Sequence, residues 1–172
     1  MTSIDRLDAE LLSALTDDPR EGTRDLALRL GVTRNTVQAR LARLSASGVL
    51  QGFDPRVDLA RLGLTVIAFL HLELAQGALQ DVVEALGGLP HVLEVHATTG
   101  QSDLAVRVAA RSHAELQSVL QEVLALPGVV RTRTEIALTT PVPFRVGPLL
   151  AALTQDRGRG RTVPLVSDKQ DS

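Results

Sequence analysis

The segment 33-TRNTVQARLARL-44 concentrates side chains that can recognise DNA. Arginine, asparagine and glutamine carry donors and acceptors that form paired hydrogen bonds with the edges of guanine or adenine in the major groove. Arg34, Asn35 and Gln38 place these three residue types in the first half of the segment. Two further arginines follow in its second half, where phosphate oxygens are the expected partners. The segment therefore predicts a surface that reads DNA.

A helix is the element expected to present these side chains. Val37, Leu41 and Leu44 recur at the spacing of one helical face, which predicts that this face is buried. Thr33 is placed to cap the amino end of the helix with its hydroxyl, and Gly48 is placed to end it. The polar side chains on the opposite face would then be available to a partner.

The candidate DNA contacts extend beyond the base-reading positions. An arginine on the preceding segment, Arg24, can reach a phosphate, and the hydroxyls of Thr33 and Thr36 are further possible donors. An exposed helix in any arginine-rich protein can show a similar face, so that alternative stays open. The full set of candidate DNA-binding residues is Arg24, Thr33, Arg34, Asn35, Thr36, Gln38, Arg40 and Arg43.

Two more helices are predicted ahead of the reading segment. Apolar residues follow one helical stripe in 4-IDRLDAELLSAL-15, and again in 24-RDLALRL-30, for which Thr23 is the expected cap. Gly31 allows a tight turn before the third helix. Two short helices joined by such a turn and preceded by a third form the helix-turn-helix arrangement.

Composition restricts the classes of function. The chain has 172 residues and no cysteine, which excludes thiol catalysis, disulfides and cysteine-based zinc sites, so we expect a reducing cytoplasmic location. Aromatic residues make up 2%, too few for stacking single-stranded nucleic acid. We expect no signal peptide and no membrane span. The net charge is −2, but arginines gather between residues 20 and 43, which suits an anionic partner bound at one place.

The second half of the chain has a different periodicity. Apolar and alternating runs predict strands, and between them lie two amphipathic stretches that end in Gly-Gly or Pro-Gly. The resulting order is β-α-β-β-α-β, the ferredoxin-like arrangement, so the whole chain is expected to be an α+β protein. The expected strands are 65–74, 92–99, 103–110 and 129–142, and the expected helices are 78–90 and 113–126.

These patterns divide the chain into four parts. Residues 1–50 are expected to form the helix-turn-helix domain, 51–63 a hinge, and 64–142 the ferredoxin-like domain. Residues 143–172 contain Arg157-Gly158-Arg159-Gly160-Arg161 and a polar end, a composition typical of flexible segments. We therefore expect a flexible tail there.

The turn 98-TTGQSD-103 is a second candidate site. A free amino acid needs acceptors for its ammonium group and donors for its carboxylate. Asp103 offers a carboxylate, Thr98 and Thr99 offer hydroxyls, and the glycine turn exposes backbone groups. Glycine and aspartate are also the residues that ordinary turns use, so a simple structural turn is the alternative.

The chain resembles the Lrp/AsnC family of transcriptional regulators, also called feast/famine regulators. The resemblance covers roughly residues 4–142 and rests on four stretches taken together. These are 5-DRLDAELLSAL-15, 26-LALRLGVTRNTVQARLARLSASGVLQGF-53, 94-EVHATTGQSDLAVRV-108 and 127-PGVVRTRTEIAL-138. It implies an amino-terminal helix-turn-helix domain and a βαββαβ effector-sensing domain. No Ser-His-Asp set, phosphate-binding glycine loop or pair of catalytic carboxylates stands out in the sequence, so we expect no enzyme activity and no cofactor.

The resemblance also implies partners and an effector site. Family members bind double-stranded DNA, form homodimers that commonly assemble to octamers, and typically respond to an amino acid. The Gly-x-x-Asp turn at Gly100 matches the family's effector region, and the run 132-TRT-134 resembles another part of it. The candidate effector-binding residues are Thr98, Thr99, Gly100, Gln101, Asp103, Thr132 and Thr134.

Two other functions remain as alternatives at this stage. Sirohaem decarboxylases resemble the same two-domain layout, and His71, His96 or Arg107 are the residues that would hold a tetrapyrrole. Separately, His71 and His96 could meet across adjacent strands as a metal or acid–base pair, although a histidine in a strand is more often a packing or hydrogen-bonding residue. A weakly specific DNA-organising protein is the second alternative, and its binding would depend steeply on salt and little on sequence.

Overall fold

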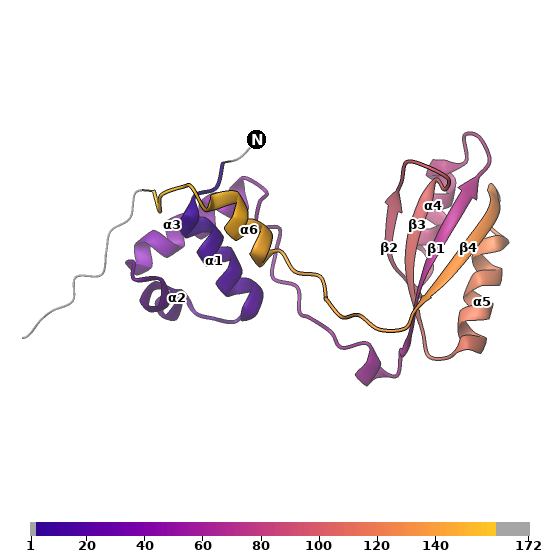
Figure 1. Ribbon diagram of the computed structural model, residues 1–172, viewed down its shortest axis with the longest axis horizontal. Helices are drawn as coiled ribbons and strands as arrows, with labels where there is room; N and C mark the ends of the chain where they lie inside the picture. The colour runs from indigo at the N-terminus through magenta and orange to yellow at the C-terminus, as the bar shows by residue number, and fades with distance from the viewer. Residues whose placement is uncertain (1–2, 161–172) are drawn as a thin grey trace, which may run out of the picture. The chain divides into compact units, whose positions relative to one another are not determined.

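The computed structural model describes residues 3–160, which form two compact units (Figure 1). One unit comprises residues 3–56 and 143–160, so it is built from both ends of the described chain. The other unit is Val57–Val142. The second unit is therefore inserted into the first, and two chain connections join them.

Three helices build the amino-terminal part of the first unit. They are α1 (Arg6–Asp17), α2 (Thr23–Leu30) and α3 (Arg34–Ala46). Their apolar stripes meet in one core, where Leu7, Leu26, Val37 and Leu44 are at most 1% exposed. The three predicted helices are thus present, with a core at the residues that their periodicity marked.

The ends of α2 and α3 explain the tight turn between them. Gly31 ends α2 with a φ of 66°, a left-handed conformation that favours glycine. The Thr33 side chain accepts a hydrogen bond from the Thr36 backbone N–H at 3.3 Å, which confirms it as the cap of α3. The expected cap at Thr23 is wrong by one residue, because α2 begins at Thr23 and Gly22 holds the cap position without a side-chain bond.

The second unit is a four-stranded antiparallel sheet covered by two helices. Its strands are β1 (Val66–Leu74), β2 (Val92–Ala97), β3 (Leu104–Ala110) and β4 (Val129–Ala137), and its helices are α4 (Leu79–Gly87) and α5 (His113–Leu124). A short 3₁₀ helix, Ala60–Leu62, precedes β1. The strand order is β2-β3-β1-β4, which confirms the predicted βαββαβ arrangement and the α+β class.

The helices bury one face of this sheet. Alternate residues of β1 and β3 pack with Val82 and Leu86 of α4 and with Val119 of α5 in a single apolar cluster. The register pairs Leu72 of β1 with Leu104 of β3, so the end of β1 lies beside the turn that precedes β3. This pairing positions the candidate effector turn against the segment that follows β1.

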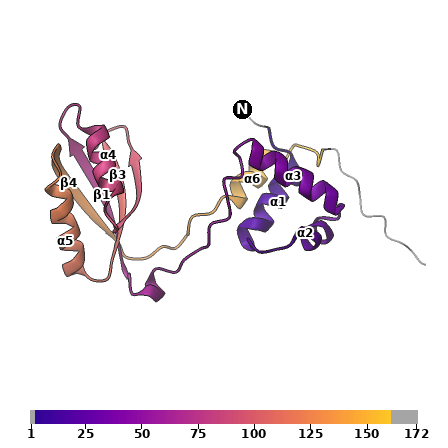
Figure 2. The same cartoon turned by 180° about the vertical axis from the view of Figure 1, so that it is seen from behind.

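The carboxyl-terminal segment differs from the expectation of a flexible tail. Residues Gly147–Thr154 form α6, which runs beside α1 in both views (Figures 1 and 2). Leu150 packs against the core of the first unit, and Thr154 is only 2% exposed. The glycine- and arginine-rich composition obscured an apolar helix just before it. Residues 161–172 of the expected tail lie outside the described residues.

The core of the first unit gives a stability prediction. Leu44→Ala removes a side chain that is fully buried, so it should lower the free energy of unfolding by about 2–5 kcal/mol. Leu28→Ala is the matched control, because Leu28 is 61% exposed and should change it by less than about 0.5 kcal/mol. Urea denaturation followed by helical circular dichroism compares the two, and equal effects would contradict the proposed core.

Candidate DNA-binding interface and effector pocket

The outward face of α3 carries three of the predicted base-reading residues. Arg34, Asn35 and Gln38 are exposed, whereas Val37 between them is 1% exposed and faces the core. The Arg34 Nε donates to Thr23 Oγ1 at 3.3 Å, which links the start of α3 to the start of α2. Arg24 on α2 is also exposed. The four polar side chains are thus exposed on the same unit, while the opposite face of α3 packs in its apolar core.

Thr33 and Thr36 are less exposed than the three predicted base-reading residues. Their hydroxyl groups lie 2.9 Å apart, and Thr33 also caps α3, so both side chains are only partly accessible. They serve the start of the helix rather than a surface beyond it. Their predicted contact with DNA stays a prediction.

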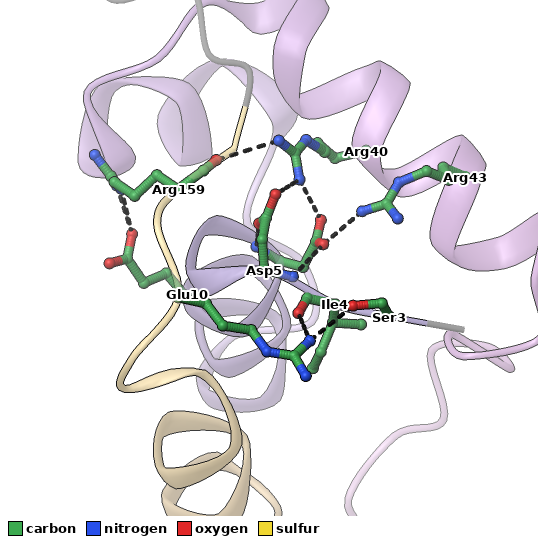
Figure 3. Close-up of polar contacts among 9 residues, drawn as sticks. Ser3, Ile4, Asp5, Glu10, Arg40, Arg43 and Arg159 are labelled. Carbon is green, nitrogen blue, oxygen red and sulfur yellow. Dashed lines mark hydrogen bonds and ion pairs between the residues drawn. The ribbon is translucent and has the colours of Figure 1, made fainter. Parts of the chain in front are cut away.

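The side chains of Arg40 and Arg43 point toward α1 and pair with its Asp8, as Figure 3 shows. The Arg40 side chain is 12% exposed, and its Nη1 donates to Asp5 and, at 2.9 Å, to Asp8 Oδ1. The Arg43 Nη2 donates to Asp8 Oδ2 at 2.5 Å. The Arg40 guanidinium is thus bonded to acceptors within the same unit, and its expected phosphate contact stays a prediction. Arg43 remains 43% exposed.

The Asp8 carboxylate is the centre of this cluster and is fully buried. Burial opposes its charge, but hydrogen bonds from Arg43, from the Asp5 backbone and from Arg40 outweigh burial and hold the pKa of Asp8 below its usual value. Burial likewise opposes the charge of Arg40, and its hydrogen bonds to Asp5 and Asp8 raise the pKa of Arg40. Each charge is thus stabilised by the others.

Sequence reasoning did not assign Asp5 and Asp8 to the interface. In the sequence, both acids lie at the predicted start of the first helix, where the helix dipole favours a negative charge. The structure has Asp5 at the cap of α1, and the two residues exchange backbone-to-side-chain bonds of 2.9 and 3.0 Å. The acid-x-x-acid spacing signals such a reciprocal cap. The pairing of Asp8 with α3 cannot be read from neighbouring residues in the sequence, because Asp8 and Arg40 are 32 positions apart.

The turn 98–103 is held by its own hydrogen bonds. The Asp103 Oδ2 accepts from the Leu74 backbone N–H at 2.7 Å, and the Asp103 N–H donates to the Leu72 carbonyl at 2.8 Å. The Thr98 hydroxyl donates to the Ser102 carbonyl at 2.7 Å. Gly100 has a φ of 122°, so a side chain there would strain the backbone. Asp103 therefore fixes the turn through its backbone N–H and one carboxylate oxygen.

A small pocket adjoins this turn. It has a volume of about 240 Å³ and combines Thr98 and Asp103 with the aliphatic side chains of Leu74 and Leu79. Sequence reasoning missed the residues that follow β1, although a strand pairing between β1 and β3 brings them there. The residues lining the pocket are Leu74, Ala75, Gln76, Gly77, Leu79, Ala97, Thr98 and Asp103. Thr99, Gly100 and Gln101 belong to the turn but do not line the pocket.

Two other predicted effector residues lie away from the pocket within one chain. Thr132 and Thr134 are on β4, where they pair with Leu72 and Leu70 of β1 on the helix-covered side of the sheet. Because β1 separates β4 from β3, these two threonines do not join the turn 98–103 in this chain.

The histidine pair considered for an enzyme does not form across adjacent strands. His71 on β1 pairs with Ala105 of β3, and Ala105 pairs in turn with His96 of β2. A whole strand therefore separates the two rings, which lie near Glu135 and Glu94 respectively. Within residues 3–160, no three histidine or acidic side chains are grouped to hold a metal ion. No helix of that region is long and apolar enough to cross a membrane.

Comparison with known families matches both units. The model of the AsnC-type helix-turn-helix domain matches residues 4–45, and that of the Lrp/AsnC ligand binding domain matches residues 67–146. The regulatory protein AsnC of Haemophilus influenzae is 30% identical over 150 residues, which cover 86% of this chain and all of that protein. The transcriptional regulator FL11 of Pyrococcus horikoshii is 29% identical, over 80% of this chain and 91% of that protein.

Solved structures agree with this result. The structure of E. coli AsnC has a TM-score of 0.79 at 28% identity and covers 86% of this chain and all of that one. A feast or famine regulatory protein from M. tuberculosis, solved with L-methionine, has a TM-score of 0.76 at 28% identity. It covers 83% of this chain and 97% of that one. These similar proteins are named as regulators, which removes the decarboxylase alternative.

The buried carboxylate gives a prediction about stability and pH. Asp8→Asn should lower the free energy of unfolding at pH 7 by about 3 kcal/mol, because Arg40 and Arg43 lose a buried charged partner. Since the folded pKa of Asp8 is depressed, its contribution is complete above the unfolded pKa of about 3.9 and is lost as pH falls through the folded pKa. The variant should therefore lose less stability than wild type between pH 5 and acid.

The control for this prediction is Asp17→Asn. The Asp17 side chain is 71% exposed and lies 3.7 Å from Arg29, so its charge should contribute less than about 1 kcal/mol. Urea denaturation across the pH range measures both variants. Identical pH dependence of Asp8→Asn and wild type would contradict the role of the Asp8 charge.

Proposed function

The chain belongs to the Lrp/AsnC family of DNA-binding transcriptional regulators, and on that premise we propose that it recognises particular DNA sequences through α3 and responds to an amino acid bound beside the turn 98–103. The observation that carries the proposal is the outward face of α3. It presents Arg34, Asn35 and Gln38 together while the opposite face is anchored.

The proposed reading of DNA divides the side chains into two roles. Arg34, Asn35 and Gln38 would contact base edges in the major groove, where each can form two hydrogen bonds to one base. Arg24 and the exposed part of Arg43 would contact phosphates on either side of the groove. Arg40 has no proposed contact with DNA, because its donors are occupied by α1.

The proposed effector is an amino acid with an apolar side chain. The Asp103 carboxylate can accept from an ammonium group, because only one of its oxygens is bonded to the Leu74 backbone. Leu74 and Leu79 offer aliphatic surface to the side chain of the effector. The M. tuberculosis regulator, which was solved with L-methionine, supports this chemistry by similarity.

The small volume of the pocket supports an assembled site. A pocket of about 240 Å³ is below the common range of roughly 300–1,000 Å³ for ligand sites. We propose that a neighbouring subunit completes it. We also propose, from the family resemblance, a homodimer that assembles further to an octamer, in which the partner covers the sheet face that carries Phe69, 41% exposed here. A two-fold dimer would present two α3 helices to half-sites about 34 Å apart.

The reading of DNA is tested with two variants of α3. Arg34→Ala and Gln38→Ala should each lower affinity for a duplex from upstream of the protein's own gene by about tenfold, because each removes a contact to a base. Affinity for an unrelated duplex should change less. We call the first unit, residues 3–56 and 143–160, the DNA-binding unit. Arg61→Ala is the control, since Arg61 is exposed and lies outside this unit.

Fluorescence anisotropy at several salt concentrations measures these affinities. Unchanged sequence preference in both variants would remove α3 as the reading helix. Steep salt dependence with equal affinity for both duplexes in wild type would instead favour the DNA-organising alternative.

The effector is tested by thermal melting against the twenty amino acids. A ligand that binds only the folded protein stabilises it by about 2.7 kcal/mol at a concentration one hundred times its dissociation constant, so the melting temperature should rise with concentration. Asp103→Asn should abolish the rise while keeping an acceptor for the Leu74 N–H. Glu122→Gln, on the exposed side of α5, should keep it. A rise that persists in Asp103→Asn would place the site elsewhere.

A further inference from the structure

The segment that follows α6 binds all three helices of the DNA-binding unit. We call residues 155–160 the strap. The Gly158 carbonyl accepts the Arg6 backbone N–H at 3.2 Å, at the first turn of α1. The Arg159 guanidinium donates to Glu10 of α1 at 2.5 and 2.9 Å, and to the Leu30 carbonyl at the end of α2 at 2.8 Å. The strap therefore connects α1 to the turn before α3.

The strap also reaches α3 through Arg40, as Figure 3 shows. The Arg159 carbonyl accepts from Arg40 Nη2 at 3.2 Å, while Arg40 Nη1 donates to Asp5 and Asp8. One guanidinium is thus shared by α1 and the strap. Because Arg40 lies in the middle of α3 and is 12% exposed, its acceptors fix how α3 lies against α1.

Glycine is required where the strap meets Arg40. Gly160 has a φ of 65°, and a Cβ there would overlap Asp5 Oδ2 and lie 2.8 Å from Arg40 Nη2. Gly158 has no such restriction, since the nearest atom to its Cβ would be the Gly160 nitrogen at 4.0 Å. The strap therefore approaches the Asp5–Arg40 pair more closely than any other residue type would allow.

We propose that the strap is a positioning element of the DNA-binding surface, and that Arg159 and Gly160 set the orientation of α3 through Arg40. Arg159 acts without touching DNA, because its guanidinium is directed to Glu10 and the Leu30 carbonyl. The strap lies outside both matched family models, which end at residues 45 and 146. The inference rests on the proposed reading of DNA by α3.

The test uses Gly160→Ala, with Gly158→Ala as the matched control. Both keep every charge, and only the first places a methyl group against Asp5 and Arg40. The probe is the duplex that the full-length wild-type chain selects from a random pool, compared with a scrambled duplex. Gly160→Ala should lower affinity for the selected duplex about tenfold, the loss that one mismatched base pair brings. Affinity for the scrambled duplex and the salt dependence should stay unchanged, and Gly158→Ala should behave as wild type.

A second variant and a second measurement keep the test decisive. Arg159→Gln should show the same pattern, and melting curves confirm that each variant is folded at the assay temperature. Hydrogen exchange of the α3 amides should accelerate in Gly160→Ala but not in Gly158→Ala, whether or not the chain prefers one DNA sequence.

The outcomes separate the inference from the proposed function. A wild-type chain with no preferred duplex overturns sequence reading by α3, and hydrogen exchange then decides on the strap alone. Wild-type affinity and exchange in both Gly160→Ala and Arg159→Gln overturn the positioning role. An Arg159→Gln salt slope reduced by about one, with equal losses on both duplexes, would show that Arg159 contacts phosphate directly and would also overturn it.

Discussion

The DNA-binding unit depends on a buried cluster of opposite charges between α1 and α3. Asp8 has no contact with water, and both of its oxygens accept from arginines of α3. A buried carboxylate is costly unless it is paired and hydrogen-bonded, and here the cost is offset by Arg40, Arg43 and the cap of α1. Removing any member would leave its partners with unsatisfied charge. The cluster therefore ties α3 to α1 through directional bonds, in addition to the apolar core that the two helices share.

The same cluster explains why the arginines of α3 differ in their surroundings. Arg34 lies on the outward face, whereas Arg40 and Arg43 lie on the side that meets α1. Six residues separate Arg34 from Arg40, so the two positions are on different faces of the helix. The arginines of this segment thus lie on two sides of α3, one exposed and one anchored to α1. A count of arginines could not separate them.

The helical and strand periodicities predicted most of the fold. The apolar stripes of α1, α2 and α3, the cap at Thr33 and the βαββαβ order were all readable, because each depends on residues close together in the chain. Pairings between distant residues were not readable. The contact of Asp8 with Arg40 and that of the strap with α1 join segments 32 and about 150 residues apart. The pocket residues after β1 were missed for the same reason, since only the strand register brings them to Asp103.

The DNA-binding unit is assembled from the two ends of the described chain, and this order has a consequence for synthesis. A ribosome makes α1, α2 and α3 first, then the whole sheet unit, and only then α6 and the strap. Domains generally fold as they emerge, amino-terminal parts first. The acceptor for Arg40 on the strap is therefore absent until the sheet unit has been completed. A nascent chain would carry its three helices early, but the hydrogen bonds between the strap and those helices could form only after the sheet unit of the same molecule has been made.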